Sequence, residues 1–386
     1  MKVSLIGCPF QTSYGYYIQR LAQALAAQAQ VRWIASNCGC GDPVERERKF
    51  ITDDCSYFEW PVVEDYRSAD PLRRKVRFFL RHALNSVRAR RYEARVEPDN
   101  DIEHFQQTLN AYGSDVAMRW LGLRSRSRRV ITVHELDEEQ RERPQWFARY
   151  NLADAVLVHD RRLGAQLESH GVDPWRIHLV RHGAHIPDGD PLPRAQRQGL
   201  VFYGGHKPMV GKGLDVLMQA YAAFVAAVGP QTAPRLLIHG HYGLRTPPQG
   251  LALAERFGVA EHIDWLNQID MEEMESLYAG AWACVLPYSG SFAGLPASTA
   301  AARGLPVIGT RMSGIPEHLD EHLLAVEPHD ADALAHALLQ LHGDQVLWAR
   351  LSRDSAAHAR RELSWQTVAA DTAELYAQLQ VPMSAA

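Results

Sequence analysis

Residues 283–310 read ACVLPYSGSFAGLPASTAAARGLPVIGT, and this stretch decides the fold class. An apolar run, 283–286, leads through a glycine-bearing loop into a helix of small residues, 297–303, and a second apolar run follows at 305–309. Short apolar runs bounded by turn residues predict buried strands, and a helix between them predicts a parallel sheet. The loop and the helix amino end then lie at the carboxyl edge of that sheet, where backbone N–H groups bind anions or hydroxyls.

A second stretch, residues 201–217, reads VFYGGHKPMVGKGLDVL and has the same organisation. A short apolar strand leads into a glycine-rich turn, and a helix begins after it. Glycines let backbone N–H groups approach an anion, the helix amino end adds partial positive charge, and lysine ammonium groups neutralise the remainder. The residues that make this turn a predicted diphosphate site are Gly204, Gly205, Lys207 and Lys212.

Two other interpretations of this turn were open from the residues alone. A P-loop is also rich in glycine and lysine, but it requires glycine at the position of His206 and serine or threonine at that of Gly213. Lys212 could also be a solvated side chain at the start of a helix. The second strand–loop–helix unit at 283–310 favours the diphosphate site, since two such loops would meet at one sheet edge.

Four short segments carry a resemblance to a known family. The segments 211–215, 294–296, 304–310 and 313–317 read GKGLD, GLP, GLPVIGT and SGIPE. They resemble successive landmarks of the retaining glycosyltransferases of family four. The resemblance covers most of the chain and is strongest in the second half. It implies an α/β chain with the GT-B fold, in which two Rossmann-like, doubly wound domains face a cleft.

The chain departs from the family pattern at three positions. Members usually carry two glutamates around the Gly-Leu-Pro element, and here Ser291 and Thr299 occupy those places. A hydroxyl forms weaker hydrogen bonds than a carboxylate, so looser donor binding is expected. The family's usual arginine, five residues before the motif lysine, is replaced by Lys207. A lysine keeps the charge and loses the bidentate fork.

The resemblance implies a metal-independent hexosyltransferase that uses a UDP- or GDP-sugar, needs no cofactor, and retains the anomeric configuration. In front-face attack the leaving diphosphate helps accept the proton of the acceptor, so the protein must stabilise charge on that leaving group. Lys207 and Lys212 are the expected charge-stabilising residues. The donor-binding set further comprises Gly15, Gly204, Gly205, Ser291, Phe292, Ala293, Gly294, Leu295 and Thr299.

Composition and length agree with a two-domain enzyme. The chain has 386 residues, of which 46% are hydrophobic, and can bury a core in each of two domains. A formal net charge of -4 does not favour nucleic acid as a partner. The five cysteines form no regular framework of disulfides or metal ligands, and we expect a reducing cytoplasm and no metal.

Strand and helix patterns alternate along the chain. A βαβ opening, with strands at 3–7 and 31–35, predicts a parallel sheet. The loop between them lacks the dinucleotide-binding glycine pattern. The proline-rich segment 187–193 reads as a linker between domains. We therefore predict a first domain at 1–186, a linker at 187–198, a nucleotide-sugar domain at 199–364, and a closing helix, 365–386, that packs back on the first domain.

Two residues of the first domain are candidates because of their position in the predicted sheet. Gly15 begins the opening helix, and His134 immediately follows the strand 130–133. Ligands of such sheets gather beyond the carboxyl ends of the strands. Thr132-Val133-His134 also resembles the family's histidine beside the donor sugar, and His134 is our candidate catalytic residue. The alternative is a histidine whose ring nitrogens are satisfied by nearby protein groups.

The acceptor is indicated only by local charge. Residues 71–91 contain eight lysines and arginines and no acidic residue, with apolar residues at helical spacing. This pattern favours a basic amphipathic helix on the anionic inner face of the cell membrane, and hence a glycan or lipid-linked acceptor, as in bacterial surface polysaccharide synthesis. A core-packing helix with a solvated basic face is the alternative. Arg124, Arg126, Arg128 and Arg129 add a second basic cluster.

A second function remains open. Because both motif glutamates are absent, the chain could be a catalytically weak relative that binds a nucleotide or a partner transferase.

Overall fold

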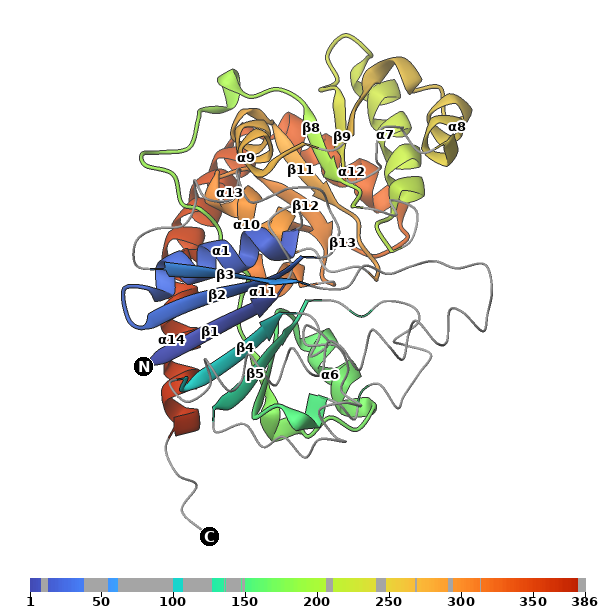
Figure 1. Ribbon diagram of the computed structural model, residues 1–386. Helices are drawn as coiled ribbons and strands as arrows, with labels where there is room; N and C mark the ends of the chain where they lie inside the picture. The colour runs from blue at the N-terminus through green and yellow to red at the C-terminus, as the bar shows by residue number, and fades with distance from the viewer. Residues whose placement is uncertain are drawn as a thin grey trace. The chain divides into compact units, whose positions relative to one another are not determined.

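The structure is a computed structural model that describes residues 1–7, 13–37, 55–61, 100–106, 127–134, 136, 147, 150–205, 211–240, 248–267, 269–290, 294–312 and 314–380 (Figure 1). Its internal contacts divide the chain into two units. Unit 1 is Met1–Val180 with Val368–Ala386, and unit 2 is Arg181–Thr367.

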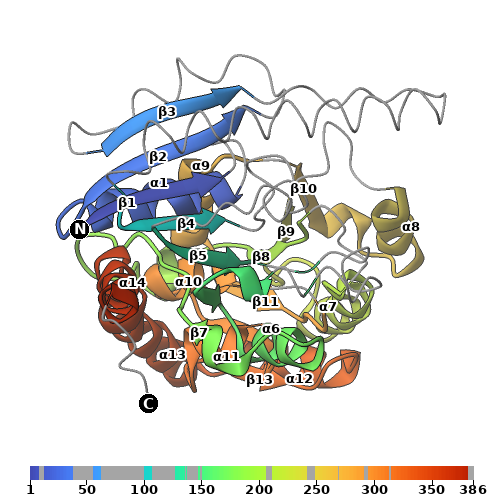
Figure 2. The same cartoon turned by 60° about the horizontal axis from the view of Figure 1, so that its bottom comes forward.

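Within the described residues, unit 1 has a seven-stranded parallel sheet in the order β3-β2-β1-β4-β5-β6-β7. Figure 2 shows β3, β2, β1, β4 and β5 side by side in this order. The central strands are buried on both faces, as in a sheet covered by helices. The strands are β1 (Lys2–Gly7), β2 (Gln30–Asn37), β3 (Cys55–Pro61), β4 (Ile102–Gln106), β5 (Arg128–Val133), β6 (Ala155–Val158) and β7 (Ile177–Leu179).

Unit 2 has a six-stranded parallel sheet in the part of the chain that the structure describes, in the order β10-β9-β8-β11-β12-β13. The order reverses beside β8, which pairs with β9 on one side and with β11 on the other. Such a switch point is where doubly wound sheets bind ligands. The strands are β8 (Leu200–Tyr203), β9 (Leu236–His239), β10 (Ile263–Asn267), β11 (Ala283–Leu286), β12 (Val307–Thr310) and β13 (Leu324–Val326).

Helices connect the strands, and several begin at a side-chain cap. Asp160 accepts a hydrogen bond from the N–H of Leu163 at 2.7 Å at the start of α6, and Asp270 and Glu273 form a capping box at the start of α9. Unit 1 contains α1 (Ser13–Leu25) and α6 (Arg161–Ser169). Unit 2 contains α7 (Leu214–Val228), α8 (Pro248–Arg256), α9 (Met271–Gly280), α10 (Gly294–Ala302), α11 (Ile315–Leu319), α12 (Ala331–Gly343) and α13 (Gln345–His358).

The last helix, α14 (Trp365–Gln380), begins in unit 2 and continues in unit 1. In unit 1 the hydroxyl of Tyr376 lies 2.5 Å from Nδ1 of His104 in β4, and Nε2 of the same ring lies 2.7 Å from Oγ1 of Thr132 in β5. The helix is thereby joined to the centre of the first sheet by a buried polar network.

The predicted fold class is confirmed: both units are α/β with parallel, Rossmann-like sheets. Strands β3 and β13, at the edges of their sheets, were not predicted from the sequence.

Candidate functional site

The glycines after β8 lie where the sequence predicted a diphosphate site. Gly204 donates its N–H to the carbonyl of His239, at the end of β9, over 2.8 Å. Gly205 adopts a φ of +59°, in the left-handed region that favours glycine. This backbone therefore turns away from the sheet at the switch point beside β8.

The turn before α7 approaches the loop after β11 so closely that only glycine fits. Gly213, which caps the helix at a φ of +71°, would carry a Cβ 2.4 Å from the carbonyl oxygen of Pro287. The N–H groups of Ser289 and Gly290 both donate to the carbonyl of Gly211, at 3.0 and 3.2 Å. The two loops singled out from the sequence are thus joined at one edge of the unit 2 sheet.

Lys212 lies within this junction and is only 9% exposed. Its Nζ lies 4.0 Å from the ring centroid of Tyr288 and 5.4 Å from that of Tyr203. The Tyr288 hydroxyl donates to the backbone carbonyl of Tyr203. A Cβ on Gly205 would lie 3.4 Å from Cε of Lys212, so the lysine stem runs beside the glycine turn. The ammonium group is held against tyrosine rings at the carboxyl edge, not extended into solvent.

Helix α10 begins at Gly294 and Leu295, and all nine of its residues are buried. The hydroxyl of Ser298 donates a hydrogen bond to the carbonyl of Gly294 over 2.7 Å, and Thr299 is 6% exposed. The helix begins four residues after Gly290, whose N–H donates to Gly211 at the loop junction. Predicted site residues Lys207, Ser291, Phe292 and Ala293 lie outside the described residues, as do the basic segment 71–91 and two arginines of the second basic cluster, Arg124 and Arg126.

In unit 1, His134 follows β5 as predicted and is 3% exposed. Its Nε2 lies 2.9 Å from Oε1 of Gln106 at the end of β4, and its Nδ1 lies 3.1 Å from Nε2 of His159, just after β6. Tyr17 packs edge-on against the His134 ring at 4.8 Å between centroids. Three neighbouring strands therefore bring polar side chains together at one edge, and Gln106 and His159 were not predicted.

The backbone carbonyl of Val180, which accepts from His159, determines where the ring protons of this hydrogen-bond network lie. Nδ1 of His159 lies 2.7 Å from the carbonyl of Val180 and must donate to it, so Nε2 of a neutral His159 accepts. Burial lowers the pKa of His159 to about 4, so this ring is neutral at pH 7. His134 consequently donates from Nδ1, and Nε2 of a neutral His134 needs a donor.

Among the described residues, the Gln106 amide faces this nitrogen, and its own nitrogen would be a donor. As placed, the oxygen faces His134 while Nε2 of Gln106 is buried without an acceptor in the described part of the chain. Turning the amide would let its nitrogen donate to Nε2 of a neutral His134, and such assignments follow from the hydrogen-bond network. Both ring nitrogens of His134 are therefore engaged by side chains of unit 1. Gly15 is buried in the first turn of α1, two residues before the Tyr17 that contacts this ring.

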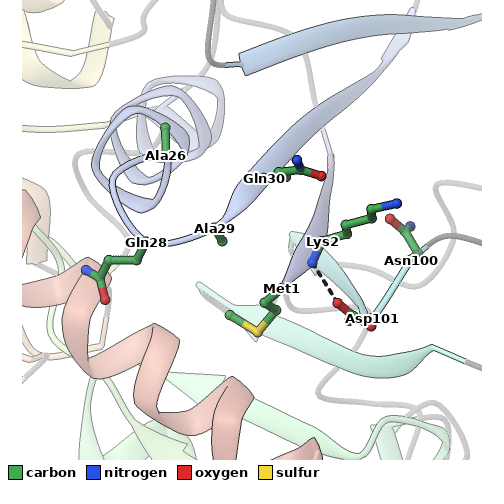
Figure 3. Close-up of a pocket in the computed structure, with 8 residues that line it drawn as sticks. All are labelled: Met1, Lys2, Ala26, Gln28, Ala29, Gln30, Asn100 and Asp101. Carbon is green, nitrogen blue, oxygen red and sulfur yellow. Dashed lines mark hydrogen bonds between the residues drawn. The ribbon is translucent and has the colours of Figure 1, made fainter.

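A pocket of about 740 Å³ opens at the other edge of the unit 1 sheet, where β1, β2 and β4 begin (Figure 3). The backbone N–H of Lys2 donates to Asp101 there over 2.7 Å. Because sites of parallel sheets lie at the carboxyl edge, we do not assign the donor to this pocket. Within the described ranges, no three His, Cys, Asp or Glu residues gather to hold a metal ion. No described helix has the length and apolar character needed to cross a bilayer.

Comparison with known sequences gives the same assignment for both halves of the chain. Residues 15–186 match the family described as Glycosyltransferase Family 4, and residues 197–344 match Glycosyl transferases group 1. The D-inositol 3-phosphate glycosyltransferase of Corynebacterium efficiens is 32% identical over 245 residues. That match covers 58% of this chain and 57% of the relative, so it spans little more than half the length of the curated protein.

Solved structures share the fold over nearly the whole chain. Sucrose-phosphate synthase from Thermosynechococcus elongatus superposes with a TM-score of 0.71 at 22% identity, covering 98% of this chain and 99% of that one. Anabaena HepE in complex with UDP-glucose gives a TM-score of 0.71 at 14% identity and covers 98% of this chain and 100% of its own. At these identities the likeness establishes the architecture.

Proposed function

Because the chain belongs to the glycosyltransferases of group 1 and family 4, we propose that it moves a sugar from a nucleotide diphosphate sugar to an acceptor, with retention at the anomeric carbon. The donor is a UDP- or GDP-sugar. The observation that carries the proposal is the buried Lys212 at the junction of the two glycine loops, beside the amino end of α7. This combination of a cation, glycine backbone and a helix amino end suits a diphosphate.

In the proposed reaction the bond from the anomeric carbon to the diphosphate oxygen breaks, and a bond to the acceptor oxygen forms on the same face. The acceptor proton passes to the departing diphosphate. Negative charge grows on that leaving group, and Lys207, Lys212 and the backbone of Gly204 and Gly205 stabilise it. The amino end of α10 adds partial positive charge on the sugar side. The hydroxyls of Ser291 and Thr299 hydrogen-bond the donor at the positions where the family usually has glutamates.

We further propose that the acceptor is a glycan or a lipid-linked sugar in surface polysaccharide synthesis. The enzyme would be cytoplasmic and would bind the inner face of the membrane through the basic segment 71–91. The charge of that segment, eight basic residues and no acidic one, supports this proposal. The matched relatives are named for D-inositol 3-phosphate, so this compound belongs in the acceptor panel.

Titration with UDP and GDP tests the donor site. Lys212→Ala removes a charged contact to phosphate, and we expect affinity to fall about 10- to 100-fold. Arg235→Ala is the matched control, since this cation precedes β9 at the amino edge of the same sheet and pairs with Asp264 at 2.5 Å. It should leave affinity unchanged. Equal affinity of wild type and Lys212→Ala would contradict the site.

Turnover with a panel of sugar nucleotides tests the reaction, with membrane extract or D-inositol 3-phosphate as acceptor and NMR of the product anomer as readout. The buried Thr299 in place of a carboxylate favours one second candidate, a catalytically weak relative that binds a nucleotide or a partner transferase. Binding without transfer to any acceptor would support that candidate, whereas an inverted product would refute retention.

A further inference from the structure

We propose that Tyr288 is a positioning residue for Lys212, whose ring face holds the lysine ammonium ready for the diphosphate. The inference rests on the proposed function, because it concerns how the same site grips its ligand. It adds Tyr288 to the site residues expected from the sequence.

The geometry is that of a cation over an aromatic face. The Nζ of Lys212 lies 4.0 Å from the ring centroid of Tyr288, well inside the limit of about 6 Å for this interaction. Tyr203 offers a second, more distant ring at 5.4 Å. Tyr288 is fully buried and Lys212 is nearly so. Desolvated pairs of this kind are the stronger ones.

The ring is itself fixed by two strands. The hydroxyl of Tyr288 donates to the carbonyl of Tyr203 at the end of β8, and its own carbonyl accepts from Oγ1 of Thr310 at the end of β12, over 2.5 Å. Both ends of the residue are therefore anchored to the sheet edge. A ring held in this way defines one position for the ammonium group.

An aromatic partner suits a phosphate-binding lysine better than a carboxylate partner. A carboxylate would add a negative charge next to the incoming diphosphate, whereas the ring attracts the cation through its quadrupole and carries no net charge. A flexible lysine side chain loses conformational entropy when a ligand binds to it. If the ring already holds the lysine in place, this entropic cost of binding is smaller. The Tyr288 ring thus adds no negative charge beside the ammonium group.

The decisive experiment changes the ring's electrostatics at constant shape. Tyr288→Phe keeps the ring and serves as the reference, and phenylalanines carrying one, two, three and five fluorines are then placed at the same position. We expect affinity for UDP or GDP, whichever binds wild type more tightly, to fall steadily with fluorine number, by about 2- to 30-fold over the series. The melting temperature of the unliganded proteins should not follow that trend. A flat series would overturn the proposal.

A double-mutant cycle with Lys212→Met tests whether Tyr288 acts through the lysine. Tyr288→Leu should weaken diphosphate binding when Lys212 is present and change it little in the Lys212→Met background. An equal loss in both backgrounds would assign Tyr288 to loop structure and refute the inference. Wild type that binds neither UDP nor GDP would refute the proposed function and this inference with it. Binding that needs Lys212 but ignores ring fluorination would refute the inference alone.

Discussion

Gly213→Ala is the sharpest structural test of the loop junction at the candidate site. A Cβ at this position would lie 2.4 Å from the Pro287 oxygen and 3.2 Å from its carbonyl carbon. The first distance is about 1 Å shorter than an ordinary contact. Both atoms belong to the backbone, so no side chain can rotate away. The start of α7 and the loop after β11 must separate.

Two costs add at Gly213, and a second glycine isolates one of them. Gly258 has a φ of +70°, against +71° at Gly213, but a Cβ there would meet nothing within 4 Å. Gly258→Ala therefore carries only the left-handed backbone penalty of about 1 kcal/mol. Gly213→Ala carries this penalty together with overpacking, which costs about 1–3 kcal/mol more. The difference between the two variants measures the contact with Pro287.

Urea unfolding followed by tryptophan fluorescence gives the two free energies. With a slope of about 2 kcal/mol per molar urea, the midpoint of Gly213→Ala should lie about 0.5–1.5 M below that of Gly258→Ala. UDP or GDP affinity is the second readout. Separating the loops displaces Lys212, so only Gly213→Ala should bind more weakly. Equal midpoints for the two variants would refute the close approach.

Two further predictions concern buried polar groups. Burial lowers the pKa of His104 to about 3 and that of His159 to about 4, while both titrate near 6.5 when unfolded. Between these pKa values the unfolded chain binds more protons than the folded one, so the unfolding free energy should fall as the pH drops from about 6.5 to 4. The loss should reach up to about 3 kcal/mol for each histidine. Urea midpoints at pH 7 and 4.5 measure this loss, and an unchanged midpoint would contradict the burial of neutral rings. Arg197 donates to the carbonyls of Leu192 at 2.8 Å and Arg303 at 2.7 Å. Arg197→Met should lower the unfolding free energy by about 2–4 kcal/mol, measured by thermal unfolding, because both carbonyls lose their donor. Arg197→Lys should recover only part of this stability. Full recovery by lysine would show that charge alone matters.

The sequence predicted those features of the fold that are written in local patterns. Buried strands such as β5 and β8 contain short apolar runs, and the sequence alone places His134 directly after β5 and Lys212 in the loop after β8. Strands β3 and β13 were missed because polar Ser56 and Glu59 interrupt the apolar residues of β3, and β13 has only three residues. A segment that short shows no period.

The hydrogen-bond partners of the site residues could not be predicted from local sequence patterns. Tyr288 meets the carbonyl of Tyr203 across 85 positions of sequence, and His134 meets Gln106 across 28. These pairs exist because β8 lies beside β11 and β4 beside β5, and strand order is a property of the whole sheet. An aromatic residue at a strand end was the available sign of the lysine's support, but strand ends carry aromatic residues for packing as well.

The proton assignment around His134 bears on how the proposed reaction disposes of its proton. Nδ1 carries the hydrogen donated to His159, and the Nε2 lone pair receives the Gln106 amide once that amide is turned. Taking up a further proton would place Nε2–H against an amide N–H, so the amide would have to rotate back and leave its nitrogen without an acceptor. With the amide turned, the Gln106 side chain therefore offers no acceptor for a second proton on the His134 ring. In the proposed transfer the acceptor proton goes to the diphosphate, whose charge Lys212 balances. Gln106→Glu would provide such an acceptor, because a carboxylate accepts from Nε2–H and favours an imidazolium. The pH profile of transfer should then differ from that of the wild type, and identical profiles would contradict a role for this contact.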